Sequence, residues 1–215
     1  IKYMTAKEED ILTSQNLIKK GVVIDKVLDS LILTKGITSN DLLLGDKNAV
    51  MVAARILAYG PEYACEVTNP KDGQVIEHTF NLADCPFKKL PKGVKENKFE
   101  VDLPVSKKKI TFKLLDGKEE ESILKDINAS KKIGSAVAPE LTTRLRYSIT
   151  SVDGDDNKSV INNLSQNMLA RDSMHLRKIM RDVTPDIDLT QEIEIGGETV
   201  KVDIPMTVNF FWPQS

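Results

Sequence analysis

The chain has 215 residues, of which 40% are hydrophobic, so it is long enough to bury a core and disorder is not expected. Its 30 basic and 32 acidic residues nearly cancel to a net charge of −2, which argues against bulk attraction to nucleic acid or to an anionic membrane. Aromatic residues make up only 5% of the chain, too few for a surface that stacks single-stranded bases.

The first sixty residues are expected to be helical. Thr5 and Glu8 stand three residues apart and predict a capping box at the start of a helix that runs to about residue 20. A second helix is expected within residues 22–33. A longer third helix is expected to begin at Asp46 and to stop at Gly60, which is followed by proline.

Antiparallel hairpins and further helices follow. Residues 63–68 and 75–82 read as two strands joined by a turn that contains Asp72-Gly73, and residues 98–103 and 109–114 alternate in the same way. A helix is expected over residues 116–133. Residues 139–182 are expected to form three helical pieces, the first with some strand character from its β-branched residues.

The C-terminal part is expected to end in a hairpin of residues 191–195 and 198–204, turned by Gly196-Gly197. The predicted fold class is therefore α+β. It comprises an N-terminal helical segment, antiparallel hairpins, further helices and a C-terminal hairpin, packed as one compact unit over residues 1–215. The small-residue run at 134–139 offers a subdivision into residues 1–134 and 135–215 as the alternative.

Two segments are candidates for binding a partner. The loop at residues 83–97 carries Lys88, Lys89 and Lys92, which form either a solvated loop or a contact for an acidic partner. The C-terminal Phe210, Phe211 and Trp212 form an aromatic anchor that either closes the core or docks on another subunit.

No catalytic or metal-binding motif stands out in the sequence. His78 and His175 are isolated from each other, and the acidic run that follows Lys7 is better explained as charge at a helix start than as a metal cluster. The loop that starts at Asp153 lacks the glycine and glutamate that an EF-hand requires, and both cysteines are expected to be reduced. We therefore expect no enzyme activity, cofactor, metal or small-molecule substrate.

No apolar run approaches the roughly 20 residues of a membrane span. The chain opens at Ile1 without a signal-peptide pattern, so it is expected to stay in the cytoplasm of the cell that makes it.

Several motifs, in order along the chain, resemble the baseplate hub proteins of contractile-tailed bacteriophages of the T-even type. The resemblance covers essentially the whole chain, from Ile1 to the closing Phe210-Phe211-Trp212-Pro213. Its motifs are YMTAKEEDIL at residues 3–12, DLLLGD at 41–46, RILAYGPEY at 55–63 and RLR at 144–146. Relatives can carry a Cys-Pro-x-Cys knuckle at a hairpin tip, where this chain reads Asn69-Pro70-Lys71-Asp72, so no zinc site is carried over.

The resemblance implies a protein of the virion tail baseplate that is present in the host cytoplasm during assembly. Its partners would be other baseplate and tail proteins, with a homo-oligomer as a further expectation and no nucleic acid. Two roles stay open: a permanent structural component, or a transient assembly chaperone absent from the mature virion. A third role, a hydrolase that acts on the cell envelope, would require a carboxylate pair or a cleft that contains histidine.

Overall fold

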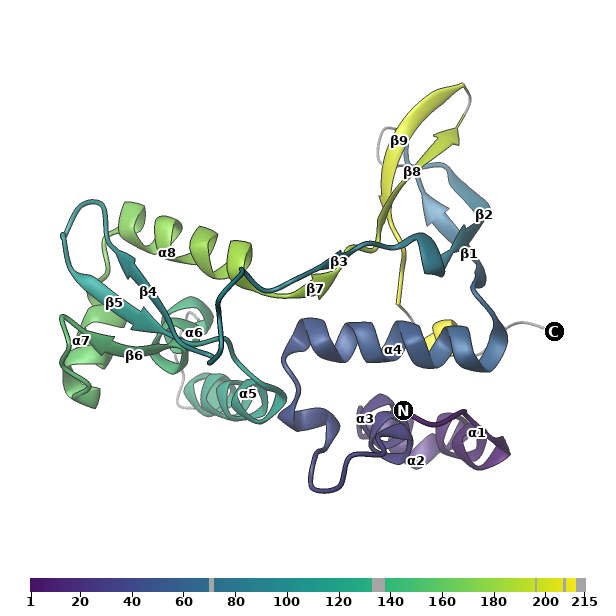
Figure 1. The fold of residues 1–215 in the computed structure, drawn as a ribbon, viewed down its shortest axis with the longest axis horizontal. Coiled ribbons are helices and arrows are strands. Elements are labelled where there is room, and N and C mark those ends of the chain that lie inside the picture. Colours follow the sequence, from purple (N-terminus) through teal and green to yellow (C-terminus); the bar gives the residue numbers. More distant parts are fainter. Residues whose placement is uncertain (70–71, 133–137, 196, 207, 212–215) are drawn as a thin grey trace. The chain divides into compact units, whose positions relative to one another are not determined.

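The computed structural model describes residues 1–69, 72–132, 138–195, 197–206 and 208–211 (Figure 1). It combines helices with antiparallel sheets, which confirms the α+β class. The α-helices are α1 (Ala6–Thr13), α2 (Gln15–Lys19), α3 (Val23–Leu31), α4 (Leu44–Tyr59), α5 (Gly117–Lys132), α6 (Glu140–Ser148), α7 (Lys158–Asn167) and α8 (Ala170–Val183). Short 3-10 turns are η1 (Ser39–Asp41), η2 (Leu82–Asp84) and η3 (Val208–Phe211).

Within the described residues, the strands form four antiparallel sheets. Their bounds are β1 (Glu62–Thr68), β2 (Val75–Asn81), β3 (Phe87–Lys88), β4 (Phe99–Asp102), β5 (Lys109–Phe112), β6 (Ile149–Val152), β7 (Asp186–Ile187), β8 (Thr190–Ile195) and β9 (Glu198–Asp203). Strands β1 and β2 pair, as do β4 and β5, and β8 and β9, which confirms the three predicted antiparallel pairs. The short pair β3–β7 was not predicted, because two residues are too few to show an alternating pattern.

The chain divides into two compact units. Unit 1 consists of residues 1–39, 45–88 and 186–215, and unit 2 consists of residues 40–44 and 89–185. Unit 1 is thus built from three separate segments of the chain. The alternative boundary expected near residue 134 falls outside the described residues.

The first helix of unit 1 is shorter than predicted. Helix α1 ends at Thr13, and Ser14 adopts extended backbone angles before α2 begins. The Thr13 hydroxyl donates to the carbonyl oxygen of Glu9 at 3.0 Å, a local side-chain bond of the kind that competes with helix continuation. The prediction of one continuous helix to about residue 20 is therefore wrong, because the helix is interrupted at Ser14.

The start of α1 is fixed by the carboxylate of Glu8, whose side chain is 0% exposed. This carboxylate pairs with Lys2 Nζ at 2.8 Å and accepts hydrogen bonds from the Thr5 backbone N–H at 2.9 Å and the Thr5 hydroxyl at 2.6 Å. The ion pair with Lys2, followed by the bonds from Thr5, lowers the pKa of Glu8 from 4.5 to about 2. The predicted capping box is confirmed.

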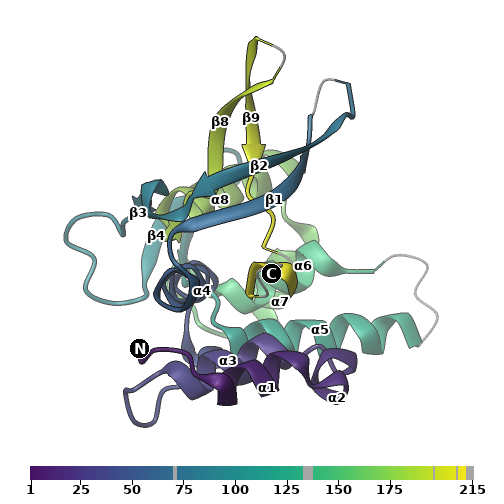
Figure 2. The same cartoon turned by 90° about the vertical axis from the view of Figure 1, so that its right-hand side faces the viewer.

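The core of unit 1 lies where the helices and the two long hairpins meet. Figure 2 shows β1–β2 and β8–β9 rising side by side from the helical part. Every second residue of each hairpin points inward, in keeping with the period of a strand. The inward residues that are buried in one cluster with α3 and α4 include Tyr63, Val67, Phe80, Ile193, Val200 and Val202.

Unit 2 is a three-stranded sheet, with strand order β4-β5-β6, and the helices α5 to α8. The sequence predicted β4 and β5 but assigned residues 149–152 to a helical stretch. The structure ends α6 at Ser148 and continues directly into β6, whose Ile149 pairs with Phe112 of β5. Ile149 and Val152 are buried in the sheet core, and their β-branched shape suits a strand.

Helix α8 begins at Ala170, two residues earlier than predicted, and Asp172 instead anchors the turn between β4 and β5. Its carboxylate accepts hydrogen bonds from the backbone N–H groups of Val105 at 2.8 Å and Ser106 at 3.0 Å. Burial by itself would raise the pKa of Asp172, but these hydrogen bonds outweigh it and hold the pKa below its ordinary value.

The segment 40–44 belongs to unit 2 because it packs on the start of α5. Gly117 N–H donates to the Leu42 carbonyl oxygen at 3.2 Å, and Lys118 forms an ion pair with Asp41. A Cβ atom on Gly117 would lie 2.9 Å from Asn40 Cα, closer than such atoms approach in proteins. Glycine is thus the residue that lets this segment reach α5.

Gly117→Ala is accordingly expected to destabilise unit 2 by about 1–3 kcal/mol, because the new methyl group meets backbone rather than a flexible side chain. Denaturant unfolding followed by circular dichroism measures the change. Asn128→Ala, at an exposed position of the same helix, is the control and should change stability by less than about 0.5 kcal/mol. Equal stability of the two variants would contradict the proposed close packing.

Candidate interaction surfaces

The predicted aromatic anchor at the C-terminus is located mainly inside unit 1. Phe210 and Phe211 are 0% exposed, and their rings meet edge to face at 5.3 Å between centroids. The Phe210 ring also meets Tyr63 edge to face at 5.1 Å. For Phe210 and Phe211, the structure therefore shows the first of the two alternatives, in which the C-terminal segment closes the core. Trp212 lies outside the described residues, and its binding of a partner stays a prediction.

The predicted lysine loop divides between the two units. Lys88 belongs to β3, where it lies opposite Asp186 of β7, while Lys89 and Lys92 are exposed in the following segment of unit 2. Within the ranges that the structure describes, neither Lys89 nor Lys92 has an ion-pair partner. Their role as contacts for an acidic partner stays a prediction.

The outer face of the β1–β2 hairpin is an exposed surface that the sequence analysis did not single out. Glu66 of β1 lies directly opposite Glu77 of β2, and both are exposed. Val75, which is 56% exposed, lies opposite Thr68 on the same face. The like charges are unfavourable in an isolated hairpin. This surface could have been found in the sequence by aligning the two strands through their Asp-Gly turn.

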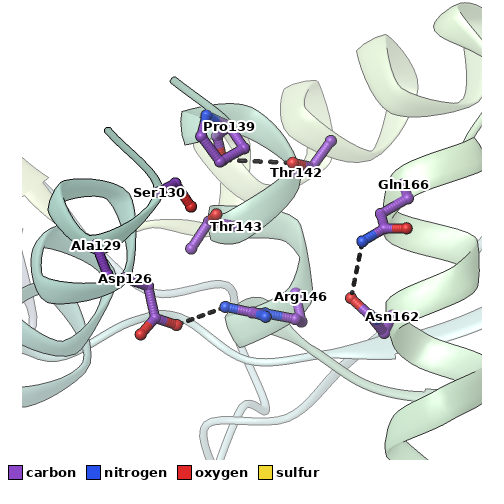
Figure 3. A pocket seen from close by; sticks show the side chains of 9 residues that line it. All are labelled: Asp126, Ala129, Ser130, Pro139, Thr142, Thr143, Arg146, Asn162 and Gln166. Atoms are coloured by element: carbon purple, nitrogen blue, oxygen red, sulfur yellow. Dashed lines mark hydrogen bonds and ion pairs between the residues drawn. The ribbon is translucent and has the colours of Figure 1, made fainter. Parts of the chain in front are cut away.

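A hollow of about 350 Å³ lies in unit 2 among α5, α6 and α7 (Figure 3). Its charged groups are Asp126 and Arg146, which form an ion pair at 2.5 Å. Asp126 also accepts a hydrogen bond from the Tyr147 hydroxyl at 3.0 Å, and burial together with this bond raises the pKa of Tyr147. Asp126 lies in α5, and Arg146 and Tyr147 lie in α6, so these contacts connect the two helices.

The neighbouring Arg144 makes a similar connection. Its Nη1 atom contacts both carboxylate oxygens of Glu120 at 2.6 and 2.8 Å, and its Nε atom contacts Glu140 at 3.3 Å. Glu120 lies in α5, whereas Arg144 and Glu140 lie in α6. The two arginines of the RLR motif therefore contribute to the packing of these helices.

Arg55, from the RILAYGPEY motif, is buried with 3% of its surface exposed. Its Nη atoms donate to the carbonyl oxygens of Gly60 at 3.1 Å and Glu62 at 3.2 Å. The guanidinium also lies over the rings of Tyr59 and Tyr63, at 5.1 and 5.8 Å from their centroids. Burial lowers the pKa of Arg55. Arg55 closes the turn from α4 to β1, a role that its sequence position alone did not predict.

Two of the residues weighed for metal or catalytic chemistry are engaged in other contacts. His78 packs edge to face on Phe80 at 4.7 Å between ring centroids. Asp153, from the rejected calcium loop, accepts a hydrogen bond from the Lys109 N–H at 2.8 Å. Among the described residues, no group of three or more His, Cys, Asp or Glu side chains could hold a metal ion, and no helix combines the length and apolar character that a membrane crossing requires. Cys65 and Cys85 are free thiols.

Comparison with known proteins identifies the family of the chain. A family model described as T4 bacteriophage base plate protein matches residues 1–212. The match covers nearly the whole chain, so the protein belongs to this family of phage baseplate proteins. The family implies the tail baseplate of the virion as its location and other phage tail proteins as its partners. No curated protein and no solved structure matches the chain.

Proposed function

We propose that the protein is a structural component of the hub region of a contractile-tail baseplate, that it acts through protein–protein contacts, and that it has no catalytic activity. The observation that carries the proposal is the shape of unit 1. Its two long hairpins are two-stranded sheets, and the described residues provide no third strand for either of them. Each hairpin thus offers an unpaired edge and an exposed outer face on which a partner can bind.

The second candidate is a transient assembly chaperone that binds hub subunits in the host cytoplasm and is absent from the mature virion. The polarity of the outer hairpin face favours it. Glu62, Glu66 and Glu77 are all exposed there, and polar contacts of modest size suit a short-lived complex.

Quantitative mass spectrometry of purified virions and of assembly intermediates from infected cells tests both candidates. If the protein is a structural component, its peptides should occur at a fixed ratio to other baseplate proteins in mature virions. If they occur only in intermediates, the chaperone role is correct and the structural role is wrong. Their absence from both samples would contradict a role in the tail.

A further inference from the structure

Helix α8 of unit 2, labelled in Figure 1, carries basic side chains on its exposed side. The helix buries Asp172, Ser173 and Leu176 on its opposite side. Residues three or four positions apart lie on the same side of a helix. The exposed residues that recur at this spacing, or next to it, are Arg171, Met174, Arg177, Lys178, Arg181 and Asp182, so the face carries four cations and one anion.

This face has the composition of a binding surface. Met174 is 61% exposed and lies among the cations, although an isolated methionine side chain is more stable when buried. Arginine and methionine are enriched in protein interfaces, whereas lysine is depleted. In the part of the chain that the structure describes, Arg171 and Lys178 have no ion-pair partner. The hydrogen-bonded backbone of the helix holds these groups in a fixed arrangement.

The outer face of the β1–β2 hairpin is complementary to this helix face in charge and in apolar content. It presents the opposed Glu66 and Glu77 beside the exposed Val75. Cations placed between the two carboxylates would remove the repulsion between them. Contact between Val75 and Met174 would at the same time remove apolar surface from water.

We propose that the basic face of α8 in one copy of the protein docks on the outer face of the β1–β2 hairpin in a second copy. The two surfaces differ, so the contact is heterologous, and repetition of it produces a ring or an open chain of copies. The proposal deepens the proposed baseplate function and rests on it, since it names one partner and the two surfaces that meet.

A charge-swap experiment on the full chain tests the proposal. One variant carries Glu66→Arg and Glu77→Arg, and the other carries Arg171→Glu and Lys178→Glu. Self-association of the wild type is measured by sedimentation velocity and should weaken at least about tenfold when salt is raised from about 0.05 M to about 0.5 M. Each variant alone should lose self-association, because both surfaces are basic in the hairpin variant and the helix face no longer carries a net positive charge in the helix variant. An equimolar mixture of the two variants should regain it.

The matched control is Lys89→Glu with Lys92→Glu, which changes the net charge as much as the helix variant does and should self-associate like the wild type. Circular dichroism confirms that every variant is folded. A wild type that stays monomeric at low salt, a mixture that does not associate, or a loss of association in the control would each overturn the proposal. A monomeric wild type that is nevertheless found in purified virions would refute the contact between copies and leave the baseplate role standing.

Discussion

Replacing Phe210 by alanine is expected to lower the free energy of unfolding of unit 1 by about 3–5 kcal/mol. The side chain is 0% exposed and packs edge to face on Tyr63 and Phe211. Its removal leaves a cavity in a core where separate segments of the chain meet, so neighbouring side chains can fill it only in part. Denaturant unfolding followed by circular dichroism measures the loss, and hydrogen exchange of β1 and β8 assigns it to unit 1.

Phe87→Ala is the matched control for this experiment. Phe87 is also a phenylalanine of unit 1, but it is 61% exposed, so its replacement should change stability by less than about 1 kcal/mol. If the two variants unfolded at the same denaturant concentration, the assignment of the aromatic tail to the core would be wrong.

Glu8→Gln is expected to destabilise unit 1 by about 2–3 kcal/mol near neutral pH, because the ion pair with Lys2 is lost while a neutral amide can still accept from Thr5. The pKa of Glu8 is lowered from 4.5 to about 2 in the folded chain. A carboxylate with a lowered pKa contributes stability that is fully present above its unfolded pKa and is lost as pH falls through the folded one. The difference between wild type and variant should therefore shrink between about pH 5 and about pH 2.

Asp10→Asn removes a negative charge from the same helix at an exposed position and serves as the control. It should change stability by less than about 0.5 kcal/mol at neutral pH. A Glu8→Gln variant whose deficit did not vary with pH would show that the carboxylate contributes through shape rather than through its charge.

Local patterns in the sequence predicted much of the fold. The alternation in residues 63–68 and 75–82, with Asp72-Gly73 between them, was sufficient for the β1–β2 hairpin, and the pair Thr5 and Glu8 was sufficient for the start of α1. In each case the residues that determine the structure lie within a few positions of one another. Structures of this local kind can therefore be predicted without knowledge of the tertiary fold.

The features that the sequence did not predict depend on distant segments. Strand β6 follows α6 with no intervening glycine or proline, and only pairing with β5, some forty residues earlier, makes Ile149 a strand residue. The exposed face of α8 was overlooked because the four cations are spread over eleven positions and gather only when the helix forms. The sequence left open whether Phe210 closes the core or binds a partner, because its burial depends on Tyr63, far away in the sequence. Contacts between residues so far apart in the sequence produce no short local pattern from which they could be predicted.

The interrupted path of unit 1 has a consequence for its synthesis. Residues 89–185 of unit 2 leave the ribosome before β8, β9 and the two buried phenylalanines, while the helices and the β1–β2 hairpin of unit 1 have already emerged. Domains fold as their residues emerge, so unit 2 can form while the core of unit 1 is still open. A nascent chain cut short before residue 186 would expose Tyr63, Val67 and Phe80. Proteases and chaperones recognise such surface, so only translation through residue 211 would give a chain that escapes them.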